Sequence, residues 1–208
     1  MSDDPSLSKA YDLKTPEDSV RLYRDWAESY EDDFVAENGY ELHAHVARIF
    51  QAQGGRGPVL DIGAGTGICG AALAQADIGP IDAMDISAEM LAQAKTKGVY
   101  GALIEADILA GLPIDTGHYT GVVSSGTFTH GHVGPEALHE VLRIMSPGGL
   151  AVLSVNAKHF EAEGFGATFE AMSPQLRRLD FEEVRIYAET AQFDHADDLG
   201  RIAIFEKA

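Results

Sequence analysis

Residues 59–70 read Val59-Leu-Asp-Ile-Gly-Ala-Gly-Thr-Gly-Ile-Cys-Gly70, and the expected fold follows from this segment. Its first four residues form the short apolar run of a strand buried in a parallel sheet. Three alternate glycines then let the backbone turn tightly and approach a ligand closely. A helix that begins directly after this turn points its unpaired backbone N–H groups at the same place. The segment therefore predicts a nucleotide-type site beyond the C-terminal end of the strand.

The glycine pattern fits two kinds of nucleotide site. Gly63-x-Gly65-x-Gly67 follows Asp61 as a three-glycine turn, whereas Gly65-x-Gly67-x-x-Gly70 satisfies the dinucleotide fingerprint. An ordinary tight strand-to-helix turn is a third interpretation. Residues 81–85 read as a second strand that ends in an acid, Asp85, about 20 residues past the glycines. Either kind of nucleotide fold uses an acid at that place to hold the hydroxyls of a ribose, so a nucleotide site is favoured over the plain turn.

Composition indicates a single globular, cytoplasmic domain. The chain of 208 residues is 45% hydrophobic and 23% charged, and it has no apolar run near the ~20 residues that span a bilayer. We expect no membrane contact, because the start of the chain also lacks the basic and apolar regions of a signal peptide. The net charge of −18 repels phosphate backbones, so we expect no nucleic-acid substrate. Cys69 is the single cysteine, which excludes an intramolecular disulfide.

Strands and helices are expected to alternate after residue 58. Residues 1–14 are expected to be loosely ordered, and residues 15–208 to form one domain with two leading helices over 15–53. Strands are expected at 59–62, 78–83, 99–104, 119–125 and 150–155, with helices between them. This alternation predicts an α/β fold with a parallel sheet and helices on both faces. Segment 156–179 is expected to be a helical cover over the ligand edge, and strands 182–188 and 201–207 to form an antiparallel pair.

The order of these motifs resembles that of the class I S-adenosylmethionine-dependent methyltransferases. The similarity covers residues 55–155 and rests on the glycine turn, Asp85-Ile-Ser87, Ala106-Asp107-Ile108 and Ser146-Pro-Gly-Gly-Leu150. The family has a Rossmann-like, seven-stranded, mostly parallel sheet with an antiparallel C-terminal pair, which matches the expected end of this chain. The resemblance implies S-adenosylmethionine (SAM) as cofactor. A nicotinamide-dependent oxidoreductase, the alternative that the second glycine pattern allows, would not predict the antiparallel pair.

The resemblance also implies roles for individual residues. Asp61 would lie near the amino group of the cofactor, Asp85 would hold its ribose hydroxyls and Asp107 would accept a hydrogen bond from its adenine. Each acid could instead be a helix-cap or turn residue. The remaining residues with an implied cofactor contact are Gly63, Ala64, Gly65, Gly67, Ile86, Ile108 and the backbone around Ser125.

The segment Tyr23-x-x-Trp26-Ala-x-x-Tyr30-x-x-Asp33 is similar to the N-terminal helix of small methyltransferases of the Williams–Beuren-region type. This similarity implies that Trp26 and Tyr30 cover the cofactor. The alternative is that both rings pack in the core.

Histidines are the candidates for a general base, which would help a hydroxyl or protonated amine to accept a methyl group. His130 and His132 follow the fourth strand, and His159 in the covering segment is a third candidate. We expect no metal, because the sequence marks no further ligands beside the pairs His43-x-His45 and His130-x-His132. The favoured function is methyl transfer to a small molecule. A non-catalytic SAM-binding domain that acts through a partner surface is a further alternative.

Overall fold

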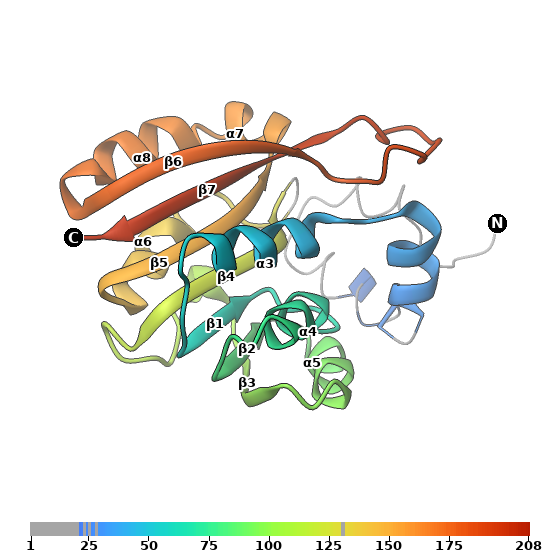
Figure 1. The fold of residues 1–208 in the computed structure, drawn as a ribbon, viewed down its shortest axis with the longest axis horizontal. Coiled ribbons are helices and arrows are strands. Elements are labelled where there is room, and N and C mark those ends of the chain that lie inside the picture. Colours follow the sequence, from blue (N-terminus) through green and yellow to red (C-terminus); the bar gives the residue numbers. More distant parts are fainter. Residues whose placement is uncertain (1–20, 23, 25, 28, 130–131) are drawn as a thin grey trace.

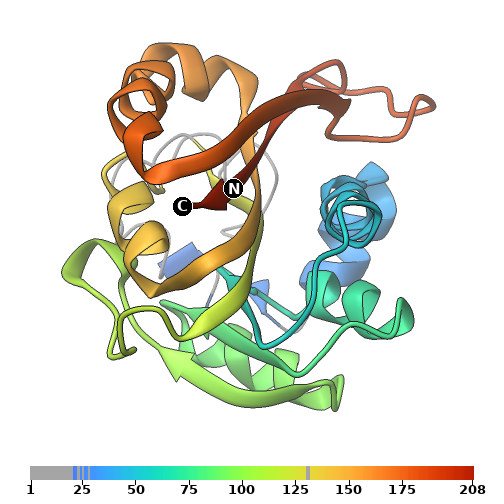
Figure 2. The ribbon, with the colours of Figure 1, turned by 60° about the vertical axis from the view of Figure 1, so that its left-hand side comes forward.

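The computed structural model describes residues 21–22, 24, 26–27, 29–129 and 132–208, and shows one seven-stranded sheet between two layers of helices (Figures 1 and 2). The strand order is β3-β2-β1-β4-β5-β7-β6. Strands β1 to β5 are parallel, whereas β7 is antiparallel to both β5 and β6. The predicted fold class is therefore confirmed, including the antiparallel pair at the end.

The strands are β1 (Val59–Ile62), β2 (Ile81–Asp85), β3 (Tyr100–Glu105), β4 (Tyr119–Phe128), β5 (Met145–Asn156), β6 (Leu176–Arg185) and β7 (Leu199–Lys207). All four residues of β1 are buried, as expected for a strand covered on both faces. Adjacent residues of the central strands point to opposite faces, so that Val122 packs on one helix layer and Val123 on the other.

One helix layer contains α3 (Leu42–Ala52), α4 (Ile68–Gln75) and α5 (Ala88–Thr96). The other contains α6 (Ala137–Ile144), α7 (Ala157–Ala162) and α8 (Phe165–Met172). A π-helix, η1 (Glu31–Ala36), precedes α3, and 3-10 turns form η2 (Ile108–Ala110) and η3 (Ser173–Gln175). Local signals explain several boundaries: the Ser87 hydroxyl caps α5 by accepting from the Met90 N–H at 3.2 Å, and Gly98, at φ +67°, follows its last turn.

Two segments differ from the sequence-based expectation. Segment 156–179 forms two short helices, and Phe160, Phe165 and Phe169 anchor them on the sheet face that α6 also covers. The start of the first helix expected within residues 15–53 falls outside the described residues, and residues 31–36 form the π-helix η1. Over the part of the chain that the structure describes, no helix is long and apolar enough to cross a membrane.

Candidate functional site

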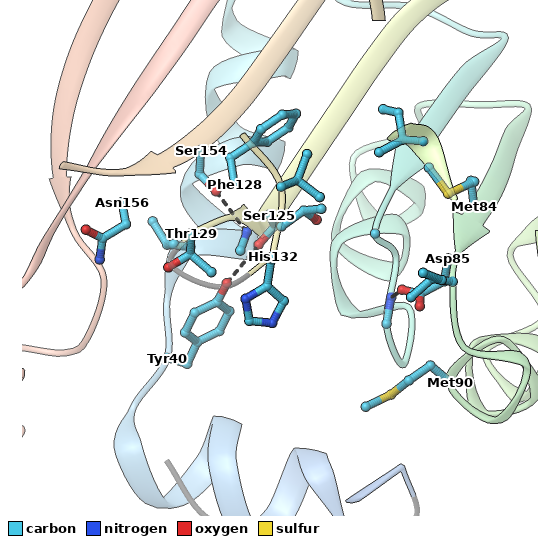
Figure 3. Close-up of a pocket in the computed structure, with 18 of the residues that line it drawn as sticks. Tyr40, Met84, Asp85, Met90, Ser125, Phe128, Thr129, His132, Ser154 and Asn156 are labelled. Carbon is cyan, nitrogen blue, oxygen red and sulfur yellow. Dashed lines mark hydrogen bonds between the residues drawn. The ribbon is translucent and has the colours of Figure 1, made fainter. Parts of the chain in front are cut away.

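A pocket lies beyond the C-terminal ends of β1, β2, β4 and β5, where the sheet order reverses between β1 and β4 (Figure 3). Open α/β sheets bind ligands at such a switch point. The pocket has two ends of different chemistry. The acidic end is lined by Met84, Asp85, Ile86, Met90, Asp107 and Ile108, and the polar end by Tyr40, Ser125, Thr129, His132, Ser154 and Asn156.

The glycine turn after β1 forms the floor between these two ends. Gly63, Gly65 and Gly67 have φ values of +63°, +55° and +88°, a conformation that L side chains rarely adopt. A Cβ atom at Gly63 would lie 1.9 Å from the Thr127 Oγ1, so this position also requires glycine for space. A Cβ atom at Gly65 would meet nothing within 4 Å, and Gly65 lines the pocket. The backbone of Gly65 is therefore open to a ligand.

Asp85 connects the glycine turn to β2. Its Oδ2 accepts from the Gly65 N–H at 2.8 Å and its Oδ1 accepts from the Ser87 N–H at 2.9 Å. Burial raises the pKa of the carboxyl, although the backbone N–H groups of Ser87, Gly65 and Ile86 oppose this effect. Each oxygen keeps a second lone-pair direction, so the carboxylate can accept two further hydrogen bonds from a ligand diol.

Asp61 lies behind the turn and does not line the pocket. Its Oδ2 accepts from the Gly70 N–H at 3.1 Å and from the Tyr100 hydroxyl at 2.8 Å, which ties β1 to the first turn of α4. Its Oδ1 is buried and has no partner among the described residues. Burial raises the pKa of Asp61 to about 7. In the structure this acid therefore supports the turn from behind.

The acidic end offers an apolar slot with one further acid beside it. Ile86, Met90 and Ile108 present aliphatic and thioether groups on which a flat ring can pack. The Asp107 Oδ1 accepts from the Leu109 N–H at 2.8 Å and so caps η2. Its other oxygen has no partner among the described residues and is available for a ligand N–H group.

Hydroxyl, amide and imidazole groups meet at the polar end. The Tyr40 hydroxyl and the Ser125 Oγ are 3.3 Å apart, and the Ser154 Oγ accepts from the Gly126 N–H at 2.9 Å. The side chains of Tyr40, Thr129 and His132 lie on the opposite side of the pocket from Asp85 and Met90, as Figure 3 shows. These groups can bind a polar molecule next to whatever occupies the acidic end.

Aromatic rings cover the pocket from the side of η1. Tyr30 and Phe34 are stacked with ring centroids 4.9 Å apart, and Phe34 in turn packs on Tyr40 and Tyr187 at 5.1 and 6.4 Å. All four of these rings line the pocket. Trp26 packs edge-on against Tyr30 at 5.3 Å, is only 1% exposed and does not line the pocket. Trp26 therefore supports the aromatic cover from behind.

Of the residues predicted from the sequence, eight cofactor candidates and His132 line the pocket; the eight are Tyr30, Gly63, Gly65, Asp85, Ile86, Asp107, Ile108 and Ser125. Trp26, Asp61, Ala64 and Gly67 do not line it. His130 lies outside the described residues. His159 is buried elsewhere, with its Nε2 3.0 Å from the Val133 carbonyl oxygen, and does not line the pocket.

Five further residues line the polar end without a sequence motif that marks them: Tyr40, Thr129, Ser154, Asn156 and Tyr187. Ser154 and Asn156 could have been found, because they alternate at the C-terminal end of a predicted parallel strand. Tyr40 and Tyr187 meet through an isolated β-bridge that no local pattern indicates. Among the described residues, no group of three potential metal ligands lies together.

These residues fit the adenosyl cofactor. The backbone at Gly65 is open, Asp85 has two acceptor positions for a diol, and the apolar slot beside Asp107 has room for a flat ring. The chain is similar to solved structures that share this fold. A TehB-like SAM-dependent methyltransferase from Corynebacterium glutamicum ATCC 13032 Kitasato is 21% identical, with a TM-score of 0.58 over 93% of this chain and 98% of that chain.

Two other solved structures have higher TM-scores. The cyclase SpnF is 16% identical, with a TM-score of 0.68 over 94% of this chain and 97% of that chain. The N-methyltransferase NodS from Bradyrhizobium japonicum WM9, solved with S-adenosyl-L-homocysteine, is 14% identical, with a TM-score of 0.63 over 88% of this chain and 98% of that chain. At these identities the likeness concerns the fold alone.

The sheet order and the overall fold are like those of solved SAM-dependent methyltransferases. Residues 59–149 match the family model described as a methyltransferase domain, whereas no curated protein matches the chain in sequence. Residues 59–149 therefore carry a methyltransferase domain, within a fold that solved SAM-dependent methyltransferases share.

Proposed function

We propose that the protein transfers the methyl group of SAM to a small molecule bound at the polar end of the pocket. The observation that carries this proposal is the continuity of the pocket: one cavity joins the acidic end to a compartment of hydroxyl, amide and imidazole groups under an aromatic cover. Such a compartment suits a small acceptor. The net charge of −18 argues against a nucleic-acid acceptor.

The cofactor supplies a methyl group bound to a positively charged sulfur. When a lone pair of the acceptor forms a bond to this methyl group, the bond from sulfur to methyl breaks and S-adenosylhomocysteine (SAH), a neutral thioether, is the leaving group. The contribution of the chain is alignment and exclusion of water. Asp85 and the Gly65 backbone hold the adenosyl part, and Tyr30 and Phe34 close the pocket. His132 lies at the polar end, where it can take the proton that the acceptor atom loses.

Thermal unfolding with SAM, SAH and NAD tests the cofactor assignment. A ligand at 100 times its dissociation constant adds about 2.7 kcal/mol to the free energy of unfolding, which raises the Tm of a domain of this size by roughly 5–10 °C. We expect this rise with SAM and SAH and not with NAD. The Asp85→Asn variant should lose most of it, because the amide replaces one of the two acceptor oxygens with a donor.

Product formation tests the transfer itself. SAH released from a panel of small acceptors, measured by mass spectrometry, should exceed the rate without acceptor. A protein that binds SAH and methylates no acceptor would instead favour the non-catalytic interpretation. A protein stabilised by NAD alone would contradict the proposal.

A further inference from the structure

Asn156 is a buried amide whose orientation is set by the backbone. It is the last residue of β5 and the N-cap of α7, and it is 6% exposed. Its side-chain oxygen accepts from the Lys158 N–H at 3.0 Å and from the His159 N–H at 3.2 Å. Because only the oxygen of an amide can accept, these two contacts assign the oxygen to the helix.

The Asn156 amide nitrogen takes no part in these two hydrogen bonds. It has two hydrogens, and no described residue accepts either of them, although the side chain lines the pocket (Figure 3). The nitrogen does not belong to the fully buried side-chain atoms that lack a partner, so water in the pocket can accept from it. A ligand oxygen at the polar end can take the place of that water.

Ser154 adds a second donor on the same face of β5. Its Oγ accepts from the Gly126 N–H at 2.9 Å, so its own O–H proton is available to donate. It is 1% exposed and lines the pocket two residues before Asn156. The β5 side of the polar end thus presents two hydrogen-bond donors, the Asn156 amide nitrogen and the Ser154 hydroxyl. The oxygens of both side chains already accept hydrogen bonds from the protein backbone.

Fixed charges are absent from this end of the pocket in the part of the chain that the structure describes. The two lining carboxylates, Asp85 and Asp107, belong to the acidic end, and no lysine or arginine lines the pocket. An ammonium ion would find no carboxylate partner beside Asn156. A carboxylate ion would find no fixed cation, and the net charge of −18 would repel it. Among the described residues that line this end, His132 is the one that could carry a charge.

We propose, on the basis of the proposed methyl transfer, that Asn156 selects a neutral, planar acceptor that carries a carbonyl or similar hydrogen-bond-accepting oxygen. The amide nitrogen of Asn156 donates to this oxygen, assisted by the Ser154 hydroxyl. The rings of Phe34, Tyr40 and Tyr187 pack on the flat part of the molecule. Asn156 is a specificity-determining residue in this arrangement and takes no part in the chemical step.

Three para-substituted phenols, one with a neutral, one with an anionic and one with a cationic substituent, test this inference: 4-hydroxyacetophenone, 4-hydroxybenzoate and tyramine. The protein is first titrated with SAH, and the SAH-saturated protein is then titrated calorimetrically with each phenol. We expect the neutral ketone to bind at least tenfold more tightly than either ion. Failure of the first titration would contradict the cofactor site, whereas failure of the second alone would contradict the selectivity.

Two variants of Asn156 separate recognition from helix capping. Asn156→Asp keeps the shape and the capping oxygen but replaces the donor with a carboxylate, so the ketone should bind at least tenfold more weakly and tyramine should gain. Asn156→Ser keeps a capping oxygen without the amide nitrogen, so the ketone should weaken and tyramine should not gain. Gln175→Glu makes the same chemical change at an exposed site away from the pocket and should alter neither.

The expected pattern requires that SAH affinity is unchanged in all three variants. Wild-type protein that binds no phenol, or binds an ion as tightly as the ketone, would overturn the proposal. So would an Asn156→Asp variant with wild-type affinity for the ketone. If Asn156→Asp does not fold, the loss of ketone binding in Asn156→Ser, with SAH binding retained, still decides the question.

Discussion

Replacing Gly63 by alanine should destabilise the protein through a contact that can be named in advance. The new Cβ would lie 1.9 Å from the Thr127 Oγ1 and 2.9 Å from its Cβ and Cγ2. Thr127 would have to move, and its hydrogen bond to the Ile62 carbonyl oxygen, 3.0 Å long, would be lost. The φ of +63° adds strain of its own.

These effects can be given magnitudes. Left-handed backbone costs about 1–2 kcal/mol for alanine, overpacking about 1–3 kcal/mol and the lost hydrogen bond about 1 kcal/mol. The Gly63→Ala variant should therefore lose roughly 4 kcal/mol of unfolding free energy, or about 8–16 °C in Tm. Gly65→Ala is the matched control, because its φ is +55° and its Cβ would meet nothing within 4 Å. It should lose only about 1–2 kcal/mol, yet bind SAH more weakly.

A double-mutant cycle isolates the contact. Thr127→Ala alone should cost about 1 kcal/mol, because the Ile62 carbonyl oxygen keeps the Ser124 hydroxyl as a donor at 2.8 Å. In the Gly63→Ala/Thr127→Ala double variant the 1.9 Å overlap no longer exists, so the loss should be smaller than the sum of the single losses by about 2 kcal/mol. Equilibrium urea unfolding measures all four proteins. Additive losses, or equal losses at Gly63 and Gly65, would refute the steric argument.

Three further predictions concern ionisable side chains. The pKa of Asp61 is raised to about 7, so the folded protein holds a proton that the unfolded chain releases near pH 4. Relative to Asp61→Asn, the wild type should lose stability as pH rises from about 4 to 7, and a Tm difference independent of pH would contradict this. His132→Asn should lower kcat about 100-fold with SAH affinity unchanged, whereas an unchanged kcat would exclude His132 as the base. The guanidinium of Arg143 binds the Glu140 carboxylate and the Leu112 and Ile114 carbonyl oxygens, so Arg143→Lys should lower Tm by a few degrees; thermal melts that coincide would show that lysine replaces these bonds.

The sheet was predictable from the sequence because its signals are local. The apolar run at 59–62 and the alternating glycines each reflect a short-range requirement of a strand or a turn, and the acid at position 85 ends a strand at the pocket. The same is true of Asp107, which ends up at the pocket although it also caps a helix. These residues lie close together because parallel strands end at one edge of the sheet.

The polar end was less predictable, because tertiary contacts create it. Tyr40 reaches the pocket through its bridge to Tyr187, which is 147 residues away in sequence and follows the β6 strand. The aromatic spacing around Trp26 fitted both a cofactor cover and a core, and only packing shows that Tyr30 faces the pocket while Trp26 lies behind it. Segment 156–179 contains four apolar residues at helical spacing: Phe160, Phe165, Phe169 and Met172. This spacing predicts a helix but does not indicate which face of the sheet the helix covers.

The position of β7 between β5 and β6 has a consequence for synthesis on the ribosome. Strand β6 is made before β7, but it has no hydrogen-bonding partner until residues 199–207 have left the exit tunnel. Until then β5 also has an open edge, since β7 is its neighbour on that side. A nascent chain that stalls before Leu199 would therefore expose two unpaired strand edges at once, the kind of surface that chaperones recognise and that aggregates readily.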